Sequence, residues 1–121
     1  MPLPDYLSEK NSCLYAKDLK LLDLVDKYNS PLEIAFLEII SDKVKYMKRC
    51  FKNSIEKHDY KGKYSYAYAT KANYYSEVLL ESLKNVDALE TSSAYDILII
   101  ENLVNNKHIK KGVKIICNGY K

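Results

Sequence analysis

Residues 64–71 read Tyr-Ser-Tyr-Ala-Tyr-Ala-Thr-Lys. Large and small side chains alternate here, with the tyrosines on one parity and Ser65, Ala67 and Ala69 on the other. Successive side chains of a β-strand point to opposite faces of the sheet, so the alternation predicts a strand over residues 64–70. Lys71 follows directly and shares the parity of the small residues. We therefore expect a strand with one bulky face, one small face and a lysine at its C-terminal end.

Helices and strands alternate on the C-terminal side of this strand. Apolar residues at three- and four-residue spacing predict a helix over residues 74–83, and a second helix follows Ser93, which can cap it. Short apolar runs predict strands over residues 86–90 and 113–117. The order βαβαβ is typical of a parallel sheet in the α/β class. Because no helix follows to cover the last strand, we interpret the chain as the beginning of a larger protein.

The sequence before this strand divides into three parts. Residues 1–17 have no clear period and are interpreted as an N-terminal arm. Residues 18–37 are expected to form a helix and then a short strand, from Leu32 to Phe36. A long amphipathic helix is predicted from Ile40 to Ile55. It begins the third part, residues 38–121, which is expected to hold the first βα units of a truncated barrel.

The composition is that of an ordinary folded chain. Hydrophobic residues make up 47% and charged residues 29% of the 121 residues, with three Gly and three Pro, which argues against disorder. A formal net charge of +3 is too small to require a nucleic-acid partner. The length excludes a complete (β/α)8 barrel, which needs roughly 250 residues.

The sequence carries no metal, secretion or membrane signal. Its three cysteines and two histidines lack the spacing of a zinc or redox site, so no metal is expected and a reduced, cytoplasmic location is the default. The N-terminus lacks the basic and apolar regions of a signal peptide, and no apolar run is long enough to span a membrane.

Lys71 occupies a position where α/β proteins place their chemistry. In a barrel the active site lies at the C-terminal ends of the strands, so Lys71 would point into the mouth, above the small residues. An amine desolvated in such a pocket is more readily neutral and can form a Schiff base with an aldehyde such as pyridoxal phosphate. The alternative is a solvated lysine in a strand-to-helix loop, and spacing alone leaves both interpretations open.

Four segments, in order, carry a family resemblance. The segment Tyr68-Ala69-Thr70-Lys71-Ala72-Asn73 resembles the Tyr-Ala-x-Lys-Ala-Asn motif of fold-type III pyridoxal-phosphate enzymes, which include alanine racemase, diaminopimelate decarboxylase and eukaryotic-type ornithine decarboxylases. Residues 28–32, 89–96 and 115–121 resemble further segments of these enzymes. Over roughly residues 19–121, the amino-acid sequence is most similar to those of bacterial biosynthetic arginine decarboxylases.

The resemblance implies a fold, a cofactor and a set of site residues. The fold would be the incomplete N-terminal part of an alanine-racemase-like (β/α)8 barrel. Lys71 would be the catalytic residue that binds pyridoxal 5'-phosphate covalently, and Glu90, Asp96 and Asn73 would lie near the cofactor. The family's ring-stacking histidine, ring-nitrogen acid, glycine-rich phosphate loop and C-terminal β domain have no counterpart in this sequence.

The implied reaction is decarboxylation of arginine to agmatine and carbon dioxide, a lyase step of arginine catabolism that feeds polyamine and spermidine biosynthesis. The full-length parent would be a cytoplasmic homo-oligomer, and the 121 residues alone are expected to be inactive. The resemblance leaves ornithine, lysine and diaminopimelate open as alternative substrates.

Other interpretations stay open at this point. Ser93 and Asp96 also fit a capping box, Asn73 can cap a helix, and Glu90 can be a solvated acid at a strand end. The basic residues between 42 and 63, interleaved with aromatic ones, could contact nucleic acid. A cofactor-carrying barrel without catalytic activity is a further alternative.

Overall fold

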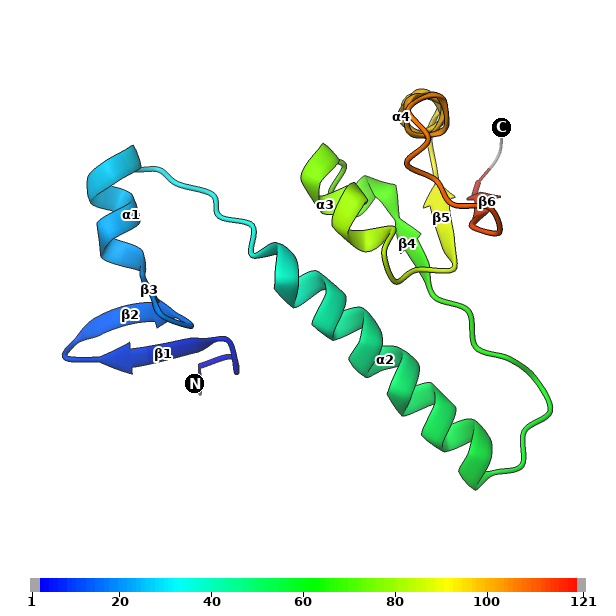
Figure 1. Cartoon of the computed structure of the whole chain (residues 1–121), viewed down its shortest axis with the longest axis horizontal. Coiled ribbons are helices and arrows are strands. Elements are labelled where there is room, and N and C mark those ends of the chain that lie inside the picture. The colour runs from blue at the N-terminus through cyan, green and yellow to red at the C-terminus, as the bar shows by residue number, and fades with distance from the viewer. Residues whose placement is uncertain (1–2, 120–121) are drawn as a thin grey trace. The chain divides into compact units, whose positions relative to one another are not determined.

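The computed structural model describes residues 3–119 and divides the chain into two compact units, between Ala35 and Phe36 (Figure 1). The first unit holds strands β1 (Leu7–Lys10), β2 (Cys13–Ala16) and β3 (Leu19–Lys20) and helix α1 (Leu21–Tyr28). The second holds helix α2 (Leu37–Lys57), strand β4 (Ala67–Ala69), a 3-10 turn (Thr70–Ala72), helix α3 (Ser76–Ser82), strand β5 (Ala88–Thr91), helix α4 (Ala94–Asn105) and strand β6 (Lys114–Cys117).

The first unit contains a β-hairpin in the segment that the sequence analysis interpreted as an arm without a clear period. β1 and β2 pair antiparallel, with Lys10 opposite Cys13, so the loop between them is Asn11-Ser12. Both loop residues have positive φ, 51° and 57°, which is the backbone conformation of the two-residue turns that match strand twist. β3 then pairs antiparallel with β2. The predicted helix follows as α1.

The prediction of a strand from Leu32 to Phe36 is wrong. Residues 31–36 have no helical or strand structure, and the two sheets described for the chain contain no partner for them. An extended apolar segment becomes a strand only when a neighbouring strand satisfies its backbone N–H and C=O groups. The segment instead connects the two units.

The parallel sheet predicted for the second unit is confirmed. Its strand order is β4-β5-β6, and both pairings are parallel, with Tyr68 opposite Leu89 and Leu89 opposite Ile115 (Figure 1). The helices expected over residues 74–83 and after Ser93 are α3 and α4, and the long amphipathic helix is α2. The second unit is therefore mixed α/β with a three-stranded sheet, and the described residues form no closed barrel.

The hydrophobic core of this unit lies on the tyrosine face of β4. Tyr66 and Tyr68 pack against a buried cluster, as the alternation in residues 64–70 predicts. The cluster draws on α2, α3, β5 and α4 and consists of Val44, Leu79, Leu83, Val86, Leu89, Ile100 and Leu103. On the opposite parity, Ala67 is exposed and Ala69 is half-buried. One face of β4 is thus buried under helices while the other is open.

Asp87 ties the start of the sheet to α2. Its carboxylate accepts hydrogen bonds from the Tyr66 backbone N–H and from Lys48 Nζ, each at 2.8 Å. Burial by itself raises the pKa of the Asp87 carboxyl, but the hydrogen bonds from Lys48 and Tyr66 outweigh it, and the pKa is lowered. The contact sets the position of α2 beside the N-terminal ends of the strands, at the edge opposite Lys71.

Across residues 3–119, no helix combines the length and the apolar character needed to cross a lipid bilayer.

Candidate cofactor-anchoring site

Lys71 lies where the sequence analysis placed it, immediately beyond the C-terminal end of β4. It is the middle residue of the 3-10 turn Thr70–Ala72, and its side chain is exposed. The desolvated setting expected for its amine is therefore absent from the described residues. The physical reason is the open sheet: with three strands, the face that carries Ala67 and Ala69 has no opposite wall to exclude water.

The turn that carries Lys71 is closed on its C-terminal side by Tyr68 and Asn73. The Tyr68 hydroxyl donates to the backbone carbonyl of Asn73 at 2.9 Å. Burial raises the pKa of the Tyr68 phenol, so the group remains a donor at neutral pH. Asn73 Oδ1 accepts the backbone N–H of Tyr75 at 3.0 Å. Asn73 thus forms a local turn before α3, whose N-cap residue is Tyr75, and does not itself cap the helix.

Glu90 lies on the same edge of the sheet as Lys71, the edge formed by the C-terminal ends of the strands. It stands opposite Ala69 in the parallel register of β4 and β5. Its Oε1 atom is buried and has no hydrogen-bond partner among the described residues. A buried acceptor without a partner carries a free-energy penalty, and such groups are typical of sites that a ligand, an ion or water completes. Glu90 is therefore the predicted site residue with an unused acceptor.

Asp96 is engaged in the N-terminal cap of α4. Its Oδ2 atom accepts the backbone N–H groups of Ser92 and Ser93, both at 2.9 Å, and its own N–H donates to Ser93 Oγ at 3.2 Å. This is the capping box that the sequence analysis kept as an alternative. The Ser92 N–H bond is the main cause that lowers the pKa of the Asp96 carboxyl, with further contributions from Ser93.

Thr70 is a residue of this site that the sequence analysis missed. Its side chain is fully buried, and its hydroxyl donates to the backbone carbonyl of Glu90 at 3.0 Å. The alternation along the strand could have identified Thr70, because Thr70 has the parity of Tyr66 and Tyr68 and therefore belongs on the face that the helices cover.

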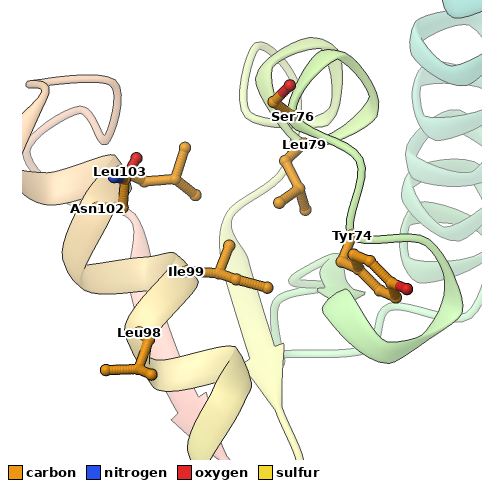
Figure 2. A pocket seen from close by; sticks show the side chains of 7 residues that line it. All are labelled: Tyr74, Ser76, Leu79, Leu98, Ile99, Asn102 and Leu103. Carbon is orange, nitrogen blue, oxygen red and sulfur yellow. The ribbon is translucent and has the colours of Figure 1, made fainter.

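Two surface pockets lie away from these residues. One, of about 360 Å³, lies between α3 and α4, and Leu79, Ile99 and Leu103 are among the residues that line it (Figure 2). Another, of about 410 Å³, lies beside the C-terminal end of α2 and is lined by Phe51, Tyr60 and other residues of that region. Lys71, Asn73, Glu90 and Asp96 line neither pocket.

The residues at this edge fit the covalent attachment of pyridoxal phosphate. Lys71 offers an accessible primary amine, and Glu90 offers an acceptor without a partner. The start of α4 does not fit the phosphate, because the N–H groups of Ser92 and Ser93 already donate to Asp96. Among residues 3–119, no group of three or more His, Cys, Asp and Glu side chains is arranged to hold a metal ion.

Comparisons with known proteins point to one group of enzymes. No protein-family profile and no solved structure matches the chain. The chain is 32% identical, over 98% of its length, to biosynthetic arginine decarboxylase of Prochlorococcus marinus subsp. pastoris (strain CCMP1986 / NIES-2087 / MED4). It is 32% identical over 93% of its length to the protein of that name from P. marinus strain MIT 9303, and 30% identical over 86% to the one from Geobacter sulfurreducens.

The similarity covers a small part of each relative. The chain spans 18% of the length of the first of these proteins and 17% of the other two. The chain is therefore a distant homologue of proteins named biosynthetic arginine decarboxylase, over about one sixth of their length.

Proposed function

We propose that this chain supplies the lysine-bearing part of a pyridoxal-phosphate-dependent arginine decarboxylase. The observation that carries the proposal is the position of Lys71, at the C-terminal edge of a parallel sheet and inside a chain that is similar, along 98% of its length, to a biosynthetic arginine decarboxylase. When bound, pyridoxal phosphate supplies an electron sink that allows arginine to lose its carboxylate as carbon dioxide and give agmatine.

Each residue of the site has a defined task in this proposal. Lys71 binds the cofactor through its side-chain amine. The side chain is exposed, so an aldehyde can reach the amine. Glu90 accepts a hydrogen bond at the buried Oε1 atom that has no partner among the described residues. The hydrogen bond from Tyr68 to Asn73 holds the turn that lies between these two residues and carries Lys71. Asp96 contributes indirectly, by holding the start of α4 next to the C-terminal end of β5.

The proposed fold of the complete enzyme is an alanine-racemase-like (β/α)8 barrel. Two features support it. The sheet is parallel and alternates with α3 and α4, as in the first units of a barrel. In addition, all four residues of the edge strand β6 are exposed, including Ile115 at 40% and Ile116 at 43%, so its edge and its faces are available to further strands and helices.

The basic residues of α2 and the following loop do not favour nucleic-acid binding as a second function. Lys48 is bonded to Asp87 at 2.8 Å, and Lys52 and Lys61 have acidic partners of their own. The ring of Phe51 stacks on Tyr64 with centroids 3.9 Å apart, so one face of the ring is already covered. Three of the eight Lys and Arg residues between positions 42 and 63 therefore have acidic partners within the chain.

Borohydride trapping tests the assignment of Lys71. The chain is incubated with pyridoxal phosphate and reduced, and the labelled lysines are located by peptide mapping. We expect the label on Lys71, its loss in Lys71→Ala, and no change in Lys43→Ala, which removes another exposed lysine on α2. A label spread evenly over the lysines, or concentrated on another one, would refute the assignment.

A chimera tests the reaction and the substrate. This chain replaces the matching segment of the P. marinus relative, and carbon dioxide release is measured with arginine, ornithine, lysine and diaminopimelate. The proposal expects release from arginine that Lys71→Ala abolishes and Lys43→Ala leaves intact. A folded chimera that prefers another amino acid would reject arginine as the substrate of this segment, while equal activity of Lys71→Ala would reject the site.

A further inference from the structure

The lysine-bearing turn is attached to the neighbouring strand through a buried hydroxyl. Thr70, the first residue of the turn, has no exposed surface, and its Oγ1 atom lies 3.0 Å from the backbone carbonyl oxygen of Glu90. The bond joins residues 20 positions apart in sequence, across the gap between β4 and β5. Lys71 is the next residue along the chain, so the backbone that carries its side chain starts from an anchored position.

The acceptor of this bond lies in the strand that leads into α4. Glu90 belongs to β5 (Ala88–Thr91), and α4 begins three residues after that strand ends, at Ala94. A threonine hydroxyl has a single proton to donate, and the Glu90 carbonyl accepts it. Thr70 therefore couples the turn to the segment that leads from β5 into α4.

A second hydroxyl bond closes the other side of the turn. Tyr68 lies before the turn, yet its hydroxyl reaches past it to the carbonyl of Asn73 at 2.9 Å. Lys71 thus sits between an anchor at Thr70 and one at Asn73. These two bonds hold the backbone of a residue whose own side chain is exposed.

We propose that Thr70 is a positioning residue, whose hydroxyl holds the Lys71 turn against β5 and so directs the amine toward the open edge that also carries Glu90. The inference rests on the proposed function of Lys71 as the cofactor anchor. It extends that function to a residue that the Tyr-Ala-x-Lys-Ala-Asn resemblance leaves unspecified, because Thr70 occupies the x position.

The structure offers a matched control one strand further on. Thr91 is also fully buried, and its hydroxyl donates to the backbone carbonyl of Ile116 in β6, at 3.5 Å. Thr70 and Thr91 therefore make the same kind of bond to the next strand, but Thr91 is 20 residues away from Lys71. Replacing either by valine keeps the shape and removes the hydroxyl, so each variant loses a hydroxyl bond to the next strand, at a different position.

The test compares Thr70→Val, Thr91→Val and the unmodified chain by two measurements. The first is the share of borohydride-trapped pyridoxal phosphate found on Lys71 rather than on other lysines. The second needs no cofactor and is the hydrogen-exchange rate of the backbone amides of residues 70–73. We expect Thr70→Val to lower the Lys71 share and to raise the exchange rate by roughly two- to tenfold, the range set by one lost hydrogen bond. Thr91→Val should leave both unchanged.

The two proposals fail in different ways. Equal labelling and equal exchange in Thr70→Val and Thr91→Val would overturn the positioning role. An unmodified chain that shows no preference for Lys71 would overturn the proposed function, and the exchange measurement would still decide whether Thr70 holds the turn. If circular dichroism shows that Thr70→Val does not fold, Thr70→Ser and Thr70→Ala replace it. These differ by the hydroxyl oxygen alone, and serine must behave as threonine does for the proposal to stand.

Discussion

Replacing Asp96 by asparagine separates the two roles that the sequence allowed for this residue. The carboxylate accepts the N–H groups of Ser92 and Ser93 at 2.9 Å, and the residue is only 5% exposed. Asparagine keeps the size but weakens these charge-assisted bonds and the favourable interaction with the N-terminal end of α4. Loss of a negative charge at a helix N-terminus costs about 0.3–1 kcal/mol in the free energy of unfolding, which lowers the melting temperature by up to about 4–8 °C in a unit of this size.

The effect of Asp96→Asn depends on pH with a defined sign. The pKa of the Asp96 carboxyl is lowered in the folded chain, mainly by the Ser92 N–H. A carboxyl of this kind contributes stability above its unfolded-state pKa, which is about 3.9 for aspartate, and the contribution is lost as the pH falls through the folded-state pKa. The difference between the two chains is therefore full at pH 7 and shrinks below about pH 4, as the wild-type carboxyl is protonated.

Thermal unfolding followed by circular dichroism at pH 7 and pH 3 measures this difference. Asp42→Asn is the control, because Asp42 is an exposed acid within α2 and lies outside the first turn. We expect Asp42→Asn to have the same melting temperature as the unmodified chain at both pH values. Equal melting temperatures for Asp96→Asn and the unmodified chain at pH 7 would refute the capping argument. Unchanged stability together with less trapping of pyridoxal phosphate on Lys71 would instead assign Asp96 to the cofactor.

Two further predictions concern catalysis and the core. The chain alone, incubated with pyridoxal phosphate and arginine, should release carbon dioxide no faster than the free cofactor does. The reason is that its one described parallel sheet leaves Lys71 exposed to water. Carbon dioxide release that is well above this background and is lost in Lys71→Ala would contradict the prediction. Leu89→Ala, which empties a fully buried site in β5, should lower the free energy of unfolding by about 2–5 kcal/mol in urea titrations, whereas Leu98→Ala, at a residue 60% exposed, should change it far less.

The second unit was largely predictable because its signals are strong and local. The alternation in residues 64–70 identifies both the strand and the face that the tyrosines bury, and this part of the prediction is confirmed by the contacts of Tyr66 and Tyr68. The strand itself is shorter, Ala67–Ala69, because hydrogen-bonded pairing with β5 extends only that far. Periodicity reports which side chains face the core, but it does not report how many residues find a partner strand.

The first unit was not predictable in the same way. β1 and β2 have four residues each, too few for a period to be recognised, and their turn uses Asn11 and Ser12 without the glycine that usually marks it. The candidate site shows a similar limit. The sequence placed Lys71 at the end of a strand, but the orphaned oxygen of Glu90 and the capping contacts of Asp96 depend on three-dimensional packing. Exposure of the Lys71 amine likewise depends on how many strands surround it.

The connection between the two units has a consequence for how the chain can be divided. Residues 31–35 are all exposed and belong to no strand or helix, and each sheet finds all of its described strand partners within its own unit. Exposed backbone outside regular structure is the preferred substrate of proteases. A single cut in this linker would therefore break no β-ladder of the described residues, and the C-terminal piece would keep the parallel sheet, its three helices and Lys71 together.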